Sequence, residues 1–231
     1  NVAEVFSTHL YTGTGSSHAI NNGIDLAGEG GLVWTKSRGA HNHSLHDSER
    51  GVTCLLRSNG TNAQYCDSTQ ISSFNSNGFT VGTDGSSNTS GRTYASWTFR
   101  NKEKFFKAVT FSYGGSSSSP TVVTHDLGCT VGMTIVKHTT GNHNWYVQHK
   151  DVTGNDNNGA LNLTIAFTGG NGQSTSFTSI TDTQATFGAA ASFPAGTYVA
   201  YFFADNSSEL ADNQMIKCGS YSSVSGNQEI N

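Results

Sequence analysis

Charged residues and proline are scarce in this chain, and each shortage argues against a class of protein. Only 12% of the 231 residues are Asp, Glu, Lys or Arg, and there are 2 prolines. Lysine and arginine form no run, and the formal net charge is −4, so the basic surface that nucleic acid attracts is missing. No apolar stretch reaches the length of a membrane span. We therefore expect neither nucleic-acid binding nor insertion into a membrane.

Cysteine is also infrequent, and its spacing argues against a zinc site. The four cysteines contain no CxxC pair of the kind found in zinc ribbons and knuckles. Cys54 and Cys66 are close enough in sequence for one hairpin to bring them together. A disulfide and a pair of reduced thiols are both open at this point.

Motifs for catalysis are missing too. The chain has no GxSxG elbow, no GxxxxGK[ST] loop, no HExxH pair and no GxGxxG between a strand and a helix. We therefore expect a protein that is not an enzyme and that needs no cofactor.

Short strands joined by turns are the dominant pattern. The chain has 27 glycines, and clusters of Gly, Ser, Thr and Asn separate runs of β-branched and aromatic residues. Residues 93–100 alternate, with Tyr94, Ser96 and Thr98 on one face and Ala95, Trp97 and Phe99 on the other. The second face is aromatic, so we predict that it is the buried one. This pattern predicts an all-β fold of antiparallel sandwiches, jelly-roll or lectin-like.

The chain also repeats itself at a spacing of roughly a hundred residues. Leu32–Lys36 returns as Met133–Lys137, and Tyr94–Phe99 returns as Tyr198–Phe203. We expect each pair to form equivalent strands, with Trp97 and Tyr201 as core aromatics. The repeat predicts tandem sandwich domains of about 100 residues each, at 1–103 and 104–212, with the start of a third at 213–231. Short polar linkers favour a stiff row of domains, and open strand edges favour a homo-oligomer.

Two loops hold the residue types that bind metal ions. His41, His43 and Asp47 offer imidazole and carboxylate groups, while Asp151 and Asp156 lie in a loop rich in Asn and Gly that offers oxygen ligands. The alternative, which we favour, is a solvated loop in the first case and a simple turn in the second.

Two aromatic residues are candidates for ligand binding. Exposed Trp145 and Tyr146 would stack on sugar rings in a carbohydrate-binding module. Such a module should carry a concave, aromatic-lined site that the other repeat lacks.

Several phrases resemble tandem repeats of tail-fibre and appendage proteins from marine tailed phages, especially cyanophages. The resemblance spans most of the chain and is carried by Leu10–Ser16, Ile20–Leu26, Gly30–Lys36, Phe74–Phe79 and Tyr94–Arg100. It implies a trimeric virion fibre or tail-associated protein that contacts other virion proteins and the host surface, including its glycans. It supplies no catalytic residues.

These observations leave three functional hypotheses. The leading hypothesis is a non-enzymatic structural and adhesive virion protein, located on the outside of the particle, that takes part in host attachment. The alternative is a lectin-like carbohydrate-binding module. The third, a polysaccharide depolymerase, needs a pair of carboxylates facing a groove, and nothing in the repeats singles out such a pair.

Overall fold

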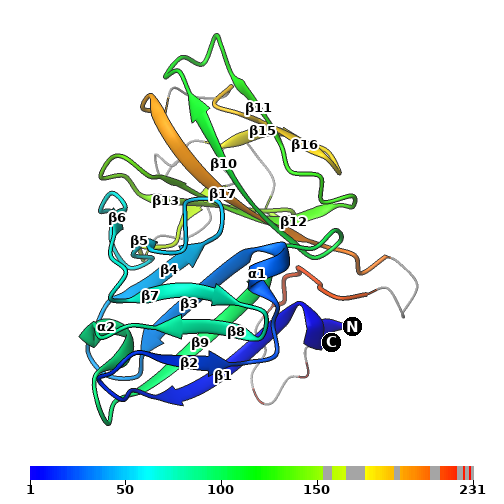
Figure 1. The fold of residues 1–231 in the computed structure, drawn as a ribbon. Coiled ribbons are helices and arrows are strands. Elements are labelled where there is room, and N and C mark those ends of the chain that lie inside the picture. Colours follow the sequence, from blue (N-terminus) through cyan, green and yellow to red (C-terminus); the bar gives the residue numbers. More distant parts are fainter. Residues whose placement is uncertain are drawn as a thin grey trace.

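The fold is almost entirely antiparallel β-structure, as the sequence predicts (Figure 1). The computed structural model describes residues 1–152, 158–164, 175–189, 193–208, 214–222, 226 and 229. We call residues 1–103 the first unit and residues 104–212 the second unit. These boundaries remain predictions from the sequence. Among the described residues, no helix has the length and apolar character needed to cross a membrane.

The first unit contains a large sheet and a small sheet. The large sheet has the order β1 (Phe6–Thr12), β9 (Thr93–Arg100), β3 (Gly31–Ser37), β4 (His43–Asp47), β5 (Cys54–Leu56) and β6 (Tyr65–Cys66). The small sheet has the order β2 (His18–Asn21), β8 (Gly78–Val81) and β7 (Ile71–Asn75). The short helical segments of this unit are η1 (Val2–Glu4), α1 (Leu26–Glu29) and α2 (Gly85–Asn88).

The second unit repeats this strand order. Its large sheet runs β10 (Phe106–Tyr113), β17 (Gly196–Ala204), β12 (Val131–His138), β13 (Trp145–His149) and β14 (Asn158–Ala160). Its small sheet runs β11 (Thr121–Thr124), β16 (Gln184–Phe187) and β15 (Phe177–Ile180). The repeated sequence segments therefore lie on corresponding strands, with β3 matching β12 and β9 matching β17.

Strand β17 is buried on both faces. Its alternate residues Tyr198, Ala200 and Phe202 point into the core under the small sheet of the second unit. Val199, Tyr201 and Phe203 point to the opposite face, into a core that also contains residues of the first unit. A strand that is buried on both faces is a continuous apolar run rather than an alternating one, which explains its composition.

The buried face of strand β9 differs from the predicted one. Tyr94, Ser96 and Thr98 form the fully buried face, under the small sheet, while Trp97 is only half-buried. The polar residues are tolerated because they are bonded: the side-chain amide of Asn22 donates to the Thr98 hydroxyl at 2.8 Å. The prediction that Tyr201 is a core aromatic is confirmed, and the same prediction for Trp97 is wrong.

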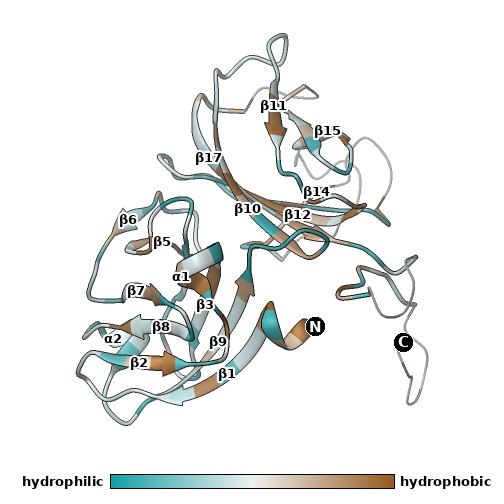
Figure 2. Ribbon diagram, turned by 45° about the vertical axis from the view of Figure 1, so that its right-hand side comes forward, coloured by the Kyte–Doolittle hydropathy of each residue, from teal (hydrophilic) through white to brown (hydrophobic). Residues whose placement is uncertain are grey.

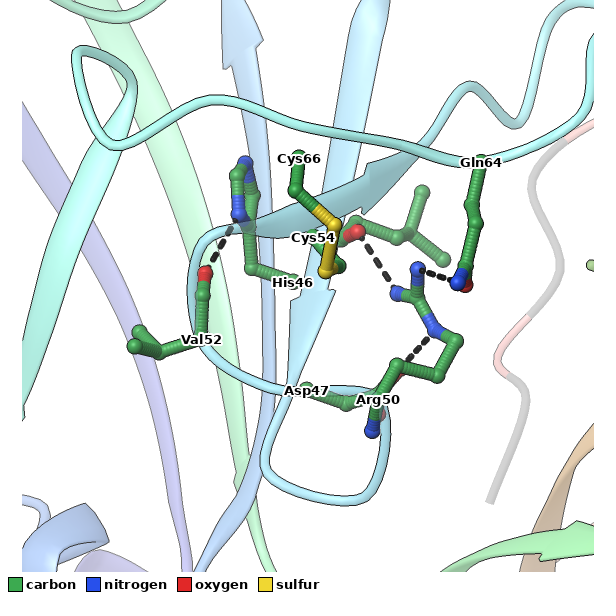
Figure 3. The surroundings of a disulfide bond; sticks show 8 residues. His46, Asp47, Arg50, Val52, Cys54, Gln64 and Cys66 are labelled. Atoms are coloured by element: carbon green, nitrogen blue, oxygen red, sulfur yellow. Dashed lines mark hydrogen bonds and ion pairs between the residues drawn. A yellow bond between two sulfur atoms is a disulfide. The ribbon is translucent and has the colours of Figure 1, made fainter.

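Cys54 and Cys66 are joined by a disulfide (Figure 3). The two residues are directly paired across β5 and β6, which is the hairpin arrangement that the sequence left open. Cys129 is buried and Cys218 is partly buried.

Removing this disulfide should lower stability. For a loop of 12 residues, the chain-entropy account gives a loss of up to about 3 kcal/mol. We expect the Cys54→Ser/Cys66→Ser double variant to unfold at lower denaturant concentration than the oxidised protein. The reduced wild-type protein should show the same loss. A reduced protein as stable as the oxidised one would contradict this expectation.

His46 on β4 is buried in its neutral form. Its Nδ1 donates to the backbone oxygen of Val52 at 2.8 Å (Figure 3). Burial lowers the pKa of His46 from 6.5 to about 4. On β13 the corresponding position is Gln148, since His46 pairs with Val33 and Gln148 pairs with Thr134.

This histidine should make the protein acid-sensitive. Because its folded-state pKa lies below its ordinary value, the unfolded chain takes up the proton first, so stability falls as the pH drops from about 6.5 towards 4. We expect His46 alone to account for a loss of about 2 kcal/mol between pH 7 and pH 5. The His46→Gln variant, which copies Gln148, should lack that part of the loss in denaturant titrations. An equal pH slope in both proteins would contradict this assignment.

Candidate functional site

The two units share a hydrophobic core, which makes their interface the most developed feature of the molecule. The large sheets meet on the faces that point away from their own small sheets. Leu32, Leu45 and Leu56 of the first unit pack there with the second unit's aromatic residues. Figures 1 and 2 show the large sheet of the second unit lying over one end of β3, while the far ends of β1 and β9 extend away from it.

The two units use different parts of the same face. We call Leu32, Leu45, Asp47 and Leu56 of the first unit the socket, and Ile135, Trp145, Val199 and Tyr201 of the second unit the knob. All eight residues are at most 4% exposed. The strand register assigns the knob positions of the first unit to Trp34, His43, Ala95 and Trp97.

These counterparts are only partly buried, and Trp34 packs at the edge of the shared core. Trp34 and Trp97 are half-buried and touch edge to face, with ring centroids 6.2 Å apart. The contact between the units is therefore not reciprocal: the knob of the second unit fills the socket of the first, and no described contact runs the other way.

A buried ion pair fixes the position of the knob. The Nε atom of Arg50 lies 2.6 Å from Oδ2 of Asp47, and the side chains are 2% and 0% exposed. The hydroxyl of Tyr201 donates to the same carboxylate oxygen at 2.7 Å. Burial, and secondarily the charge of Asp47, raise the pKa of Tyr201, so its hydroxyl keeps the proton that it donates. One carboxylate thus joins the two units.

Trp145 forms a second link between the units. Its Nε1 donates to the backbone oxygens of Arg57 at 2.9 Å and Gly60 at 3.2 Å. The side chain is fully buried, so the prediction that Trp145 is exposed for sugar stacking is wrong. The neighbouring candidate, Tyr146, lies on the other face of β13, half-buried and edge-on to Phe193 at 5.1 Å. The two residues therefore do not form one aromatic ligand site.

A lysine that occurs at the same position in both units closes a loop next to the knob. Lys137 is fully buried, and its Nζ donates to the backbone oxygens of His138 at 2.7 Å and Gly141 at 3.2 Å. Burial, with a smaller contribution from the charge of Arg50, lowers its pKa to about 8. Lys36 closes the matching loop in the first unit, donating to the oxygen of Ser37 at 2.6 Å. The repeated lysine was visible in the sequence, but its loop-closing role was not.

The predicted metal ligands do not come together. Asp47 is bound to Arg50, and His43 lies beside Trp34 with ring centroids 6.4 Å apart. Exposed His41 contacts the side chain of Arg92. Within the described part of the chain, no three His, Cys, Asp or Glu side chains are grouped so as to hold a metal ion.

The second metal candidate is only partly described. Asp151 pairs with Lys150 at 2.7 Å, and the same lysine also lies 3.1 Å from Asp205. Asp156 falls outside the described residues.

Fold and interface together define an all-β protein whose most elaborate contact joins two similar units. The chain belongs to a family described as a domain of unknown function (DUF7483), which matches residues 1–227. No curated protein and no solved structure matches the chain.

Proposed function

We propose that this chain is a structural and adhesive segment of a phage tail fibre or appendage, which takes part in host attachment without catalysing a reaction. The observation that carries the proposal is the interface in which Tyr201 of the second unit reaches Asp47 of the first. A contact that is not reciprocal adds units in one direction and so builds an extended series rather than a closed pair. A mechanical fibre needs this kind of joint.

The half-buried knob positions of the first unit, together with exposed Leu10, support the same function. Leu10 is 62% exposed, and Trp34 and Trp97 lie on the same face of the large sheet, half-buried. Exposed apolar clusters of this kind are typical of surfaces that meet another protein. They fit a unit that has neighbours on both sides, in an assembly that we expect to be a homo-oligomer, with a trimer favoured.

The disulfide is consistent with a location on the outside of a particle. Disulfides such as Cys54–Cys66 persist in oxidising surroundings and are rare in the cytosol. A virion surface structure is exposed to such surroundings after release.

Immunogold electron microscopy of purified particles tests the proposal. Antibodies raised against residues 1–231 should label a tail appendage, and preincubation with the recombinant chain should remove the label. The same antibodies should reduce adsorption of particles to host cells. Label confined to the capsid, or label that the recombinant chain does not remove, would refute the assignment.

A further inference from the structure

An apolar cavity of about 520 Å³ lies on the large sheet of the second unit. Its lining includes Met133, Val147, Leu161 and Leu163, the polar side chain of His149, and residues 219 and 220. Leu161 is 37% exposed and Leu163 is 43% exposed. Val147 is only 6% exposed, so the open apolar surface of the cavity is contributed mainly by the two leucines.

The strand register shows that this cavity corresponds to the socket of the first unit. Leu32 pairs with Asp47 on the first large sheet, and Met133 pairs with His149 on the second. Val147, two residues before His149 on the same face of β13, therefore corresponds to Leu45. In the first unit these positions are buried by the knob of the second unit. In the second unit no described knob fills them.

The segment at 214–222 follows β17 as β10 follows β9, but after a longer connection. The amide of Lys102 donates to the oxygen of Phe106 at 2.9 Å, and the amide of Asn206 donates to the oxygen of Ile216 at 3.2 Å. The side-chain oxygen of Asn206 also accepts from the amide of Ile216 at 3.1 Å. Met215, Ile216 and Cys218 pack against the shared core. In the second unit, the corresponding positions at the start of β10 are held by Phe105, Phe106 and Ala108.

We propose that the cavity is the socket for a third unit of the same fold, whose first strand is residues 214–222 and whose counterpart of Tyr201 inserts over Val147 towards His149. This inference rests on the proposed function, because it makes the series of units continue in the same direction. The proposed insertion follows the contact that Tyr201 makes with Asp47 in the present chain.

An extended chain tests the inference. In this extended chain, residues 1–222 are followed directly by residues 113–231. Ser222 then takes the place of Ser112, so the strand register is kept and a second copy of the second unit is added. Cys218 at the junction is the probe, and the Cys218 of the added copy is replaced by serine. Ala108, the counterpart of Cys218, is 0% exposed, so we expect Cys218 to react with a thiol reagent at least tenfold more slowly than in the 231-residue chain.

Two variants make the result specific. Tyr201→Ala in the added copy alone should restore the reactivity of Cys218, as should Leu161→Glu with Leu163→Glu in the first copy. The paired glutamate substitutions should leave the melting temperature of the 231-residue chain unchanged, because both leucines are exposed there.

Unchanged reactivity of Cys218 in the extended chain would overturn the inference. Proteolysis that removes the added copy would overturn it as well, because the same sequence folds against the first socket in the native chain. Neither outcome affects antibody labelling of particles. Conversely, missing label together with a protected Cys218 would refute the proposed function alone.

Discussion

Replacing Asp47 by Asn should lower the free energy of unfolding by about 3–5 kcal/mol, the usual cost of removing one partner from a buried ion pair. The side chain of Arg50 is 2% exposed, so water cannot take the place of the carboxylate. The substitution also removes the charged acceptor of the Tyr201 hydroxyl. Denaturant unfolding, monitored by circular dichroism, measures the loss.

Two further variants show whether the loss of stability arises at the contact between the units. Glu29→Gln breaks an ion pair with Arg100 in which the glutamate is 54% exposed, and it should cost less than about 1 kcal/mol. Tyr201→Phe removes the hydroxyl that donates to Asp47 and accepts from Arg50 at 3.4 Å. A double-mutant cycle with Asp47→Asn should give a coupling of about 0.5–3 kcal/mol. Strictly additive losses would show that Asp47 does not join the units.

Replacing Trp145 by Ala should cost about 3–5 kcal/mol, because the fully buried indole leaves a cavity. The same change also leaves the oxygens of Arg57 and Gly60 without the Nε1 donor that they share. Since these carbonyls belong to the first unit, both units should unfold at lower denaturant concentration.

Trp97→Ala is the matched control. Trp97 is half-buried on an uncovered face, so its removal should cost clearly less than the removal of Trp145. Equal losses would mean that the face around Trp97 is covered in solution. A small loss for both would remove Trp145 from the interface.

The strands and their equivalence could be predicted because they depend on local signals. The apolar run that ends in Lys36 and Lys137 marks β3 and β12, and turn-forming residues separate many of the strands. The Cys54–Cys66 disulfide could also be named as one of two possibilities, because a short hairpin brings the two residues together.

The burial of particular side chains could not be predicted because it depends on packing between the units. Trp145 and Trp97 are both tryptophans on strands, yet only Trp145 meets a neighbouring unit. The alternation of residues in β9 identifies the two faces of the strand, but it does not show which face is fully covered by other elements. In the folded chain the fully buried face is the polar one, which carries Ser96 and Thr98. Asp47 was a candidate metal ligand, and only the folded chain reveals that Arg50 and Tyr201 occupy its oxygens.

The most direct test of the whole account is cryo-electron microscopy of the tail appendage on native particles, at a resolution that separates the units. The account predicts consecutive sandwich units along the appendage, each placing its counterpart of Tyr201 on the preceding unit's counterpart of Asp47, with Tyr201 and Asp47 themselves in contact. Units that hang separately on linkers, or an appendage that does not contain this chain, would contradict it.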